Sequence, residues 1–123
     1  MKKRLAGAVL AVAAFTAPLA VVAPTTASAS AAACSSPGWG PYDSGYSFTV
    51  AGKSSPLRSG PNADCGVRAY VPAGTEFSID CRYVNGAGNL WYHGDVYTGG
   101  RSYSGWMYAG NLGSVYDSND ASC

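Results

Sequence analysis

The chain has 123 residues, of which 47% are hydrophobic and only 12% are charged, and its formal net charge is +1. Three of the eight basic residues stand together at positions 2–4, so the region after residue 29 keeps five basic residues against seven acidic ones, a formal charge of −2. That balance leaves no basic patch to bind nucleic acid or an anionic membrane surface through counterion release. We therefore expect neither as a partner of the region after residue 29.

The N-terminal end of the chain has the pattern of a secretory signal peptide. The three basic residues precede an apolar run over residues 5–23, and a small-residue cleavage motif follows that ends at Ala29. The same small-residue pattern recurs at Ala31 and Ala33, which are alternative cleavage positions. We predict a signal peptide over residues 1–29.

A membrane anchor is the competing interpretation of the apolar run. The run is short for a membrane-spanning helix, and it is interrupted at Thr16 and Pro18 and followed by Pro24. These features favour export with cleavage. We expect a secreted protein, either free in the medium or associated with the cell wall.

The exported part divides into two segments. Residues 30–53 are predicted to be an N-terminal arm, because residues 34–47 are rich in Gly, Pro and Ser and show no strand or helix period. A short strand is expected at residues 48–50. Residues 54–123 are then the main domain with a C-terminal tail, and turn signals with short aromatic and β-branched runs favour an all-β fold there.

A nearly mirror-symmetric segment, residues 65–81, predicts a first β-hairpin with its turn at residues 72–74. In that register the apolar pairs share one face, because directly opposed residues point the same way. These pairs are Ala69 with Phe77, Val67 with Ile79, and Cys65 with Cys81. The register therefore predicts a disulfide between Cys65 and Cys81.

All four cysteines lie in the exported part, as expected for disulfides formed in an oxidising compartment. Of the three possible pairings, the hairpin selects Cys65 with Cys81 and leaves Cys34 with Cys123. A metal site is the alternative use of four cysteines, but there is no C-x-x-C pair and His93 is the only histidine. We expect two disulfides, no metal and no cofactor.

A second hairpin is predicted around Gly99 and Gly100, which favour a two-residue turn. One face of this hairpin is apolar and should point into the core. Its opposed pairs are Val96 with Tyr103, Gly94 with Gly105, Tyr92 with Met107, and Leu90 with Ala109. The other face places Trp91 opposite Tyr108 and His93 opposite Trp106, with Tyr97 farther along.

Two interpretations of that second face stay open. The first, slightly favoured, is that residues 34–47 cover it, with His93 as a hydrogen-bonded neighbour of a second small core. The other is that it forms a partly open aromatic platform for an extended ligand. The candidate ligand-binding residues are then Trp91, His93, Trp106 and Tyr108.

The main domain resembles the bacterial SH3-like (SH3b) domains in an ordered series of short motifs. The motifs are LRSGP at 57–61, PAGT at 72–75, LWY at 90–92, GWMY at 105–108 and NL at 111–112. The resemblance implies a small β-barrel, here stabilised by two disulfides. It also implies a role beside cell-wall enzymes, where such domains bind peptidoglycan or its peptides.

We expect a non-catalytic, monomeric binding module for peptidoglycan or an extended peptide. The alternative is a secreted partner of another protein, such as an inhibitor or a component of a surface structure. An enzyme is not expected, because His93 is the only histidine and the cysteines are expected to be oxidised. Asp80 and Glu76, which fall on the polar face of the first predicted hairpin, are expected to be solvating charges.

Overall fold

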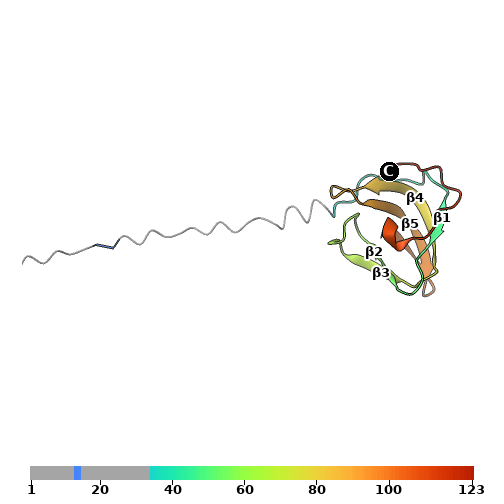
Figure 1. The fold of residues 1–123 in the computed structure, drawn as a ribbon, viewed down its shortest axis with the longest axis horizontal. Helices are drawn as coiled ribbons and strands as arrows, with labels where there is room; N and C mark the ends of the chain where they lie inside the picture. The colour runs from blue at the N-terminus through green and yellow to red at the C-terminus, as the bar shows by residue number, and fades with distance from the viewer. Residues whose placement is uncertain (1–12, 15–33) are drawn as a thin grey trace, which may run out of the picture.

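The computed structural model describes residues 13–14 and 34–123. The predicted signal peptide therefore lies, apart from residues 13 and 14, outside the described residues. Figure 1 shows the described chain as a small body of strands. The elements are β1 (Tyr46–Phe48), β2 (Ser55–Arg58), β3 (Val67–Val71), β4 (Glu76–Val84), β5 (Leu90–Thr98), β6 (Arg101–Tyr108) and the 3-10 turn η1 (Ala109–Asn111). Among these residues no helix is long and apolar enough to cross a membrane.

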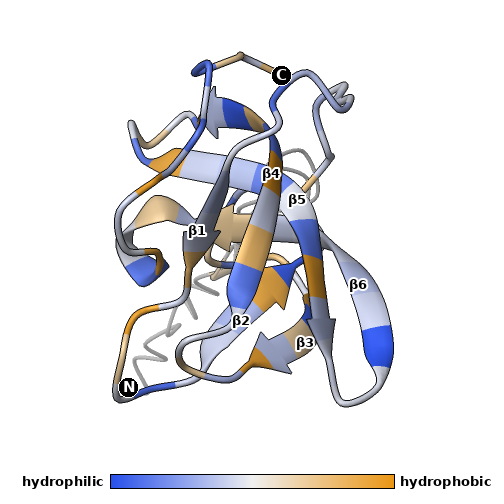
Figure 2. Ribbon diagram, turned by 90° about the vertical axis from the view of Figure 1, so that its right-hand side faces the viewer, coloured by the Kyte–Doolittle hydropathy of each residue, from blue (hydrophilic) through white to orange (hydrophobic). Residues whose placement is uncertain are grey.

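All six strands join one antiparallel sheet in the order β1-β4-β5-β6-β2-β3. Figure 2 shows β1, β4 and β5 running side by side, with β2 and β3 crossing at an angle to them. The predicted all-β class and the presence of two disulfides are confirmed. The sheet is not closed, because its edge strands β1 and β3 are not paired with each other.

The core lies on one face of this curved sheet. Burial alternates at the start of β4, as expected for a strand that presents one face to a core, whereas residues 91–94 of β5 are all buried, so both faces of that strand are covered there. The buried core residues are Leu57, Val71, Phe77, Ile79, Tyr92, Val96, Met107 and Leu112. Burial of each large apolar side chain stabilises the fold by about 1.5–3 kcal/mol.

The second predicted hairpin is confirmed. β5 and β6 pair with Val96 opposite Tyr103 and Tyr92 opposite Met107, in the predicted register. Gly99 and Gly100 both have positive φ, 59° and 78°, the backbone that a two-residue type I′ turn requires. This turn explains why the register could be read from the sequence.

The first predicted hairpin is wrong, although its turn forms. β3 pairs with β2, whereas β4 pairs with β1 and β5, so β3 and β4 form no ladder. In the sheet order, three strands, β5, β6 and β2, lie between β4 and β3. Ala69 and Val71 of β3 still share a core with Phe77 and Ile79 of β4, but the predicted core residue Val67 is 37% exposed. The mirror symmetry of the segment thus reflects a shared core and not strand pairing.

The predicted disulfide pairing is wrong as well. The disulfides join Cys34 to Cys65 and Cys81 to Cys123. A β-bulge in β4 contributes to the error: Ile79 is opposite Gly94, but Cys81 is opposite His93, which leaves Asp80 as the extra residue. Because a bulge shifts the alternation by one, Cys81 lies on the face opposite to that of Ile79.

The N-terminal and C-terminal segments pack against this sheet. Within the predicted arm, β1 joins the sheet beside β4, and it spans Tyr46–Phe48 instead of the expected residues 48–50. The C-terminal tail makes isolated bridges from Tyr116 to Tyr46 and from Ser122 to Arg82. The arm and the tail thus contact β4 along the edge that does not pair with β5.

Candidate ligand-binding groove

The structure places the four predicted site residues on one face of β5 and β6, as two cross-strand pairs. Trp91 is opposite Tyr108, with ring centroids 5.6 Å apart, and His93 is opposite Trp106, with ring centroids 5.1 Å apart. Trp91, His93 and Trp106 are at most 3% exposed, whereas Tyr108 is 39% exposed. The four residues therefore do not form one open platform.

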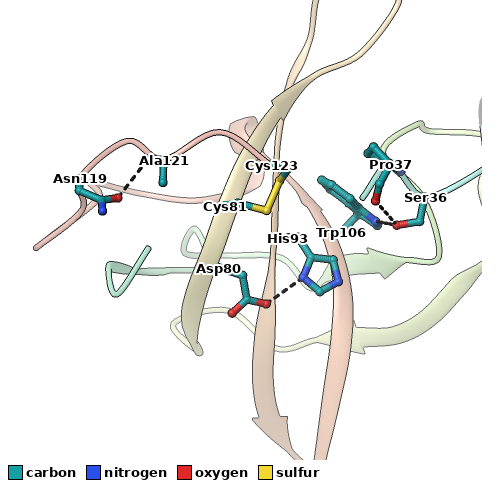
Figure 3. The surroundings of a disulfide bond; sticks show 9 residues. All are labelled: Ser36, Pro37, Asp80, Cys81, His93, Trp106, Asn119, Ala121 and Cys123. Carbon is teal, nitrogen blue, oxygen red and sulfur yellow. Dashed lines mark hydrogen bonds and ion pairs between the residues drawn. A yellow bond between two sulfur atoms is a disulfide. The ribbon is translucent and has the colours of Figure 1, made fainter. Parts of the chain in front are cut away.

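The N-terminal arm covers the His93 and Trp106 pair. The indole of Trp39 stacks on the imidazole of His93 at a centroid distance of 3.8 Å. The Nε1 of Trp106 donates a hydrogen bond of 3.0 Å to the hydroxyl of Ser36, which Figure 3 shows beside the Trp106 ring. The interpretation that the arm covers this face is thus confirmed for this half of it.

His93 is held from the other side by a carboxylate. Its Nδ1 lies 2.8 Å from the Oδ2 of Asp80, the bulge residue of β4 (Figure 3). Burial lowers the pKa of His93 from its usual value, and the hydrogen bond and negative charge of Asp80 only partly oppose this effect.

The Trp91 and Tyr108 pair lies in a groove of about 390 Å³. The groove forms where three connections meet: the loop 59–66 between β2 and β3, the turn 85–89 between β4 and β5, and η1. Its lining residues are Pro56, Arg58, Asn62, Ala63, Asp64, Asn85, Ala87, Asn89, Trp91, Tyr108 and Asn111. Two of the four predicted residues, Trp91 and Tyr108, thus belong to a hollow in the surface.

Side-chain hydrogen bonds hold the walls of the groove in place. The Nη1 of Arg58 donates to the carbonyl of Cys65 at 2.8 Å, which ties the loop to the end of β2. The amide of Asn85 donates to the carbonyl of Pro61 at 3.0 Å and so joins the loop to the turn 85–89. Because Cys65 is also bonded to Cys34, the groove has a preformed wall before any ligand binds.

The groove offers hydrogen-bonding groups that the protein itself does not use. Among the described residues, the side-chain amides of Asn89 and Asn111 make no hydrogen bond. The Nε1 of Trp91 is buried and has no acceptor there either. A buried donor without a partner costs about 1–3 kcal/mol. Such a donor is unusual, but it is shielded from solvent and is not among the groups that the groove offers to a ligand.

The groove carries little net charge. Arg58 and Asp64 contribute one positive and one negative charge, and the remaining lining residues are neutral. The described residues contain no cluster of three or more metal-ligating side chains. Its chemistry is therefore that of aromatic stacking and amide hydrogen bonding.

The sequence did not point to the asparagines of the groove. They come from three separate connections and meet only because the sheet brings these connections to one end. The one available signal was their concentration in turn segments, where asparagine has a local structural role. Comparisons of the chain with protein-family models, with curated proteins and with solved structures found no match.

Proposed function

We propose that this protein is a secreted, non-catalytic, SH3-like binding module that holds an extended peptide of the bacterial cell wall in the Trp91 and Tyr108 groove. The observation that carries the proposal is the set of side chains in the groove. There the half-exposed phenol of Tyr108 lies beside the indole of Trp91, and the side-chain amides of Asn89 and Asn111 have no partner among the described residues. Aromatic rings and unused amide groups are what a peptide backbone with small side chains requires.

An extended ligand is favoured over a compact one because the hollow continues past the groove. A neighbouring hollow of about 410 Å³ shares Asn62, Asn85 and Ala87 with it and reaches Ser35 and Tyr83. The two together follow the loop 59–66 along the surface. A chain-like ligand that crosses the bridge between Pro61 and Asn85 would contact both.

The cellular setting of the proposal comes from the sequence motifs and the disulfides. The SH3b resemblance implies a cell-wall role, and the leader pattern implies export. Two disulfides, with no free cysteine among the described residues, are consistent with an extracellular protein. The open six-stranded sheet supports the all-β part of the resemblance.

Co-sedimentation with purified peptidoglycan tests the proposal. Tyr108→Ala removes a half-exposed ring from the groove and should weaken binding about tenfold, since such aromatic anchors contribute the most to recognition. Tyr97→Ala is the matched control, because Tyr97 is 68% exposed on β5 and lies outside the groove. Failure of the wild-type protein to sediment, or equal loss in both variants, would contradict the proposal.

A second candidate function, binding to a partner protein, is favoured by one exposed aromatic cluster. Tyr46 contacts Phe48 and Tyr116 at ring-centroid distances of 5.9 and 5.4 Å, and Phe48 and Tyr116 are 40% and 47% exposed. Exposed apolar clusters tend to mark protein interaction sites. Loss of a co-purifying protein from Phe48→Ser, with peptidoglycan binding retained, would support this second function.

A further inference from the structure

A second, smaller hollow lies beside the covered half of the aromatic face. Its volume is about 140 Å³. It is lined by Ser36, Trp39, Ser59, Arg68, His93, Gly105 and Trp106. None of these residues lines the groove, so the pocket is a separate site that does not depend on the proposed function.

His93 presents an unused ring nitrogen to this pocket. The side chain is 97% buried, and its Nδ1 is engaged by Asp80. Figure 3 shows the other ring nitrogen, Nε2, pointing away from Asp80. Among the described residues Nε2 has no hydrogen-bond partner, and it is not one of the solvent-inaccessible unpaired atoms there, which are Ser55 Oγ and Trp91 Nε1. Because a carboxylate can only accept, the Nδ1–H of His93 donates a hydrogen bond to Asp80, and Nε2 of the neutral imidazole keeps its lone pair.

Arg68 supplies a positive charge at the same pocket. One of its terminal nitrogens, Nη1, donates to the carbonyl of Ser104 at 3.0 Å. Among the described residues its guanidinium makes no ion pair, since the two ion pairs there are Arg82 with Asp120 and His93 with Asp80. The remaining N–H groups of Arg68 are therefore available to an anion, for which guanidinium has a matching fork geometry.

The size and walls of the pocket limit what it can hold. A cavity of about 150 Å³ in another protein holds benzene, a ligand of about six heavy atoms. The indoles of Trp39 and Trp106 provide flat apolar walls on either side of His93. The pocket thus fits one small residue with an apolar side chain.

We propose that this pocket binds the C-terminal residue of a peptide that ends in a small, uncharged amino acid. The terminal carboxylate accepts hydrogen bonds from Arg68, and the amide N–H of the terminal residue donates to Nε2 of His93. The small side chain packs against the indoles of Trp39 and Trp106, which line the pocket. Capture of a C-terminal carboxylate is a recurring mode of peptide recognition.

The charges around His93 make this binding measurable. Asp80, Asp95 and Arg68 are the charged groups that act on the imidazole. A bound carboxylate adds a negative charge beside it and favours the protonated form. The hydrogen bond from the ligand amide to Nε2 requires the neutral ring, so the two contacts act on protonation in opposite directions, and binding is read from the shift of the His93 resonances.

The test uses the imidazole resonances of His93, which are unambiguous because the chain has only one histidine. Protein without a histidine tag is titrated with N-acetyl-alanine, in both enantiomers, and with the N-methylamide of the same compound. We expect saturable shifts of the His93 resonances at millimolar carboxylate and no saturation with the methylamide. Equal shifts with the methylamide, or no saturable shift with either enantiomer, would overturn the proposal.

Two variants separate a specific site from a general salt effect. Arg68→Gln should weaken carboxylate binding at least about tenfold, because it removes a charge-assisted hydrogen bond. Arg101→Gln, at the exposed start of β6, is the matched control and should leave the affinity unchanged. An unchanged affinity in Arg68→Gln, or an equal loss in both variants, would also reject the site. The Trp91 and Tyr108 groove is intact in both variants, so failure here leaves the proposed function standing.

Discussion

The Nδ1 of His93 lies 2.8 Å from the Oδ2 of Asp80, and the indole of Trp39 closes over the imidazole. The only histidine of the chain is thus buried between a carboxylate of β4 and the N-terminal arm. The pKa of His93 lies below its usual value because burial disfavours the charged ring. This relationship links the protonation of one residue to the packing of the arm.

Stability should therefore fall on acidification through the range in which histidine titrates. The unfolded chain binds a proton at His93 near pH 6.5, whereas the folded protein binds it only at lower pH, so stability rises with pH between the two pKa values. Thermal unfolding of wild type should show this loss as the pH drops below about 6.5, and His93→Gln should lack it. The same pH dependence in both proteins would contradict the assignment.

A second acid-sensitive group, Asp43, has a pKa below the range in which histidine titrates. Burial opposes its ionisation, but hydrogen bonds from the Ser118 hydroxyl and from the backbone of Gly45, Asn119 and Ala121 outweigh burial and lower its pKa. Its contribution to stability is present above the unfolded pKa of about 3.9 and is lost as the pH falls through the folded value. In Asp43→Asn the further loss of stability below about pH 4 should be smaller than in wild type. An undiminished loss would show that other carboxylates dominate acid unfolding.

The disulfide connectivity gives a direct chemical test. Non-reducing peptide mapping should recover Cys34 joined to Cys65 and Cys81 joined to Cys123. A fragment that joins Cys65 to Cys81 would contradict the fold. Because the two bridges span 31 and 42 residues, the chain-entropy estimate for each is about 4 kcal/mol. Replacing either pair with serine should lower the free energy of unfolding by similar amounts.

Gly94 lies on β5 opposite Ile79 of β4. A Cβ at this position would meet the backbone oxygen of Ser78 and the ring of Phe77. Since a backbone atom cannot move aside as a flexible side chain can, Gly94→Ala should destabilise the protein by more than about 2 kcal/mol. Gly86→Ala is the control, because nothing lies within 4 Å of its added methyl group and its φ is not positive. Chemical denaturation of both variants measures the difference, and equal stabilities would contradict the strand packing.

The two aromatic residues of the groove should respond differently to truncation. Trp91 is 3% exposed, so Trp91→Ala should cost about 3–5 kcal/mol of stability. Tyr108 is 39% exposed, and Tyr108→Ala should cost about 1 kcal/mol or less. Only Tyr108→Ala therefore separates binding from folding. A strongly destabilised Tyr108→Ala would show that the ring supports the fold.

The success of sequence-based prediction depended on how local each interaction was. Gly99 and Gly100 determine a two-residue turn, so the β5 and β6 register and both of its faces were predicted correctly. The pairing of β3 with β2 depends on contacts across the whole domain, and a symmetric segment says nothing about which strand comes between its halves. The bulge at Asp80 could not be predicted either, because the apolar alternation before it is regular.

The candidate site was predicted in part for the same reason. Trp91 and Tyr108 were found together because they are neighbours across a local hairpin. The covering of His93 by Trp39 was anticipated only as one of two interpretations, because nothing in the sequence places the arm. Asn89 and Asn111 reach the groove from separate connections, so their meeting could not be predicted without the sheet order.

The central claim is that the Trp91 and Tyr108 groove is where the ligand binds. Backbone amide shifts, recorded while soluble peptidoglycan fragments are added, test it most directly. The account predicts that the perturbed amides cluster in residues 59–66, 85–91 and 108–111, which surround the groove. Shifts confined to Tyr46, Phe48 and Tyr116, or no shifts in the presence of fragments, would contradict it.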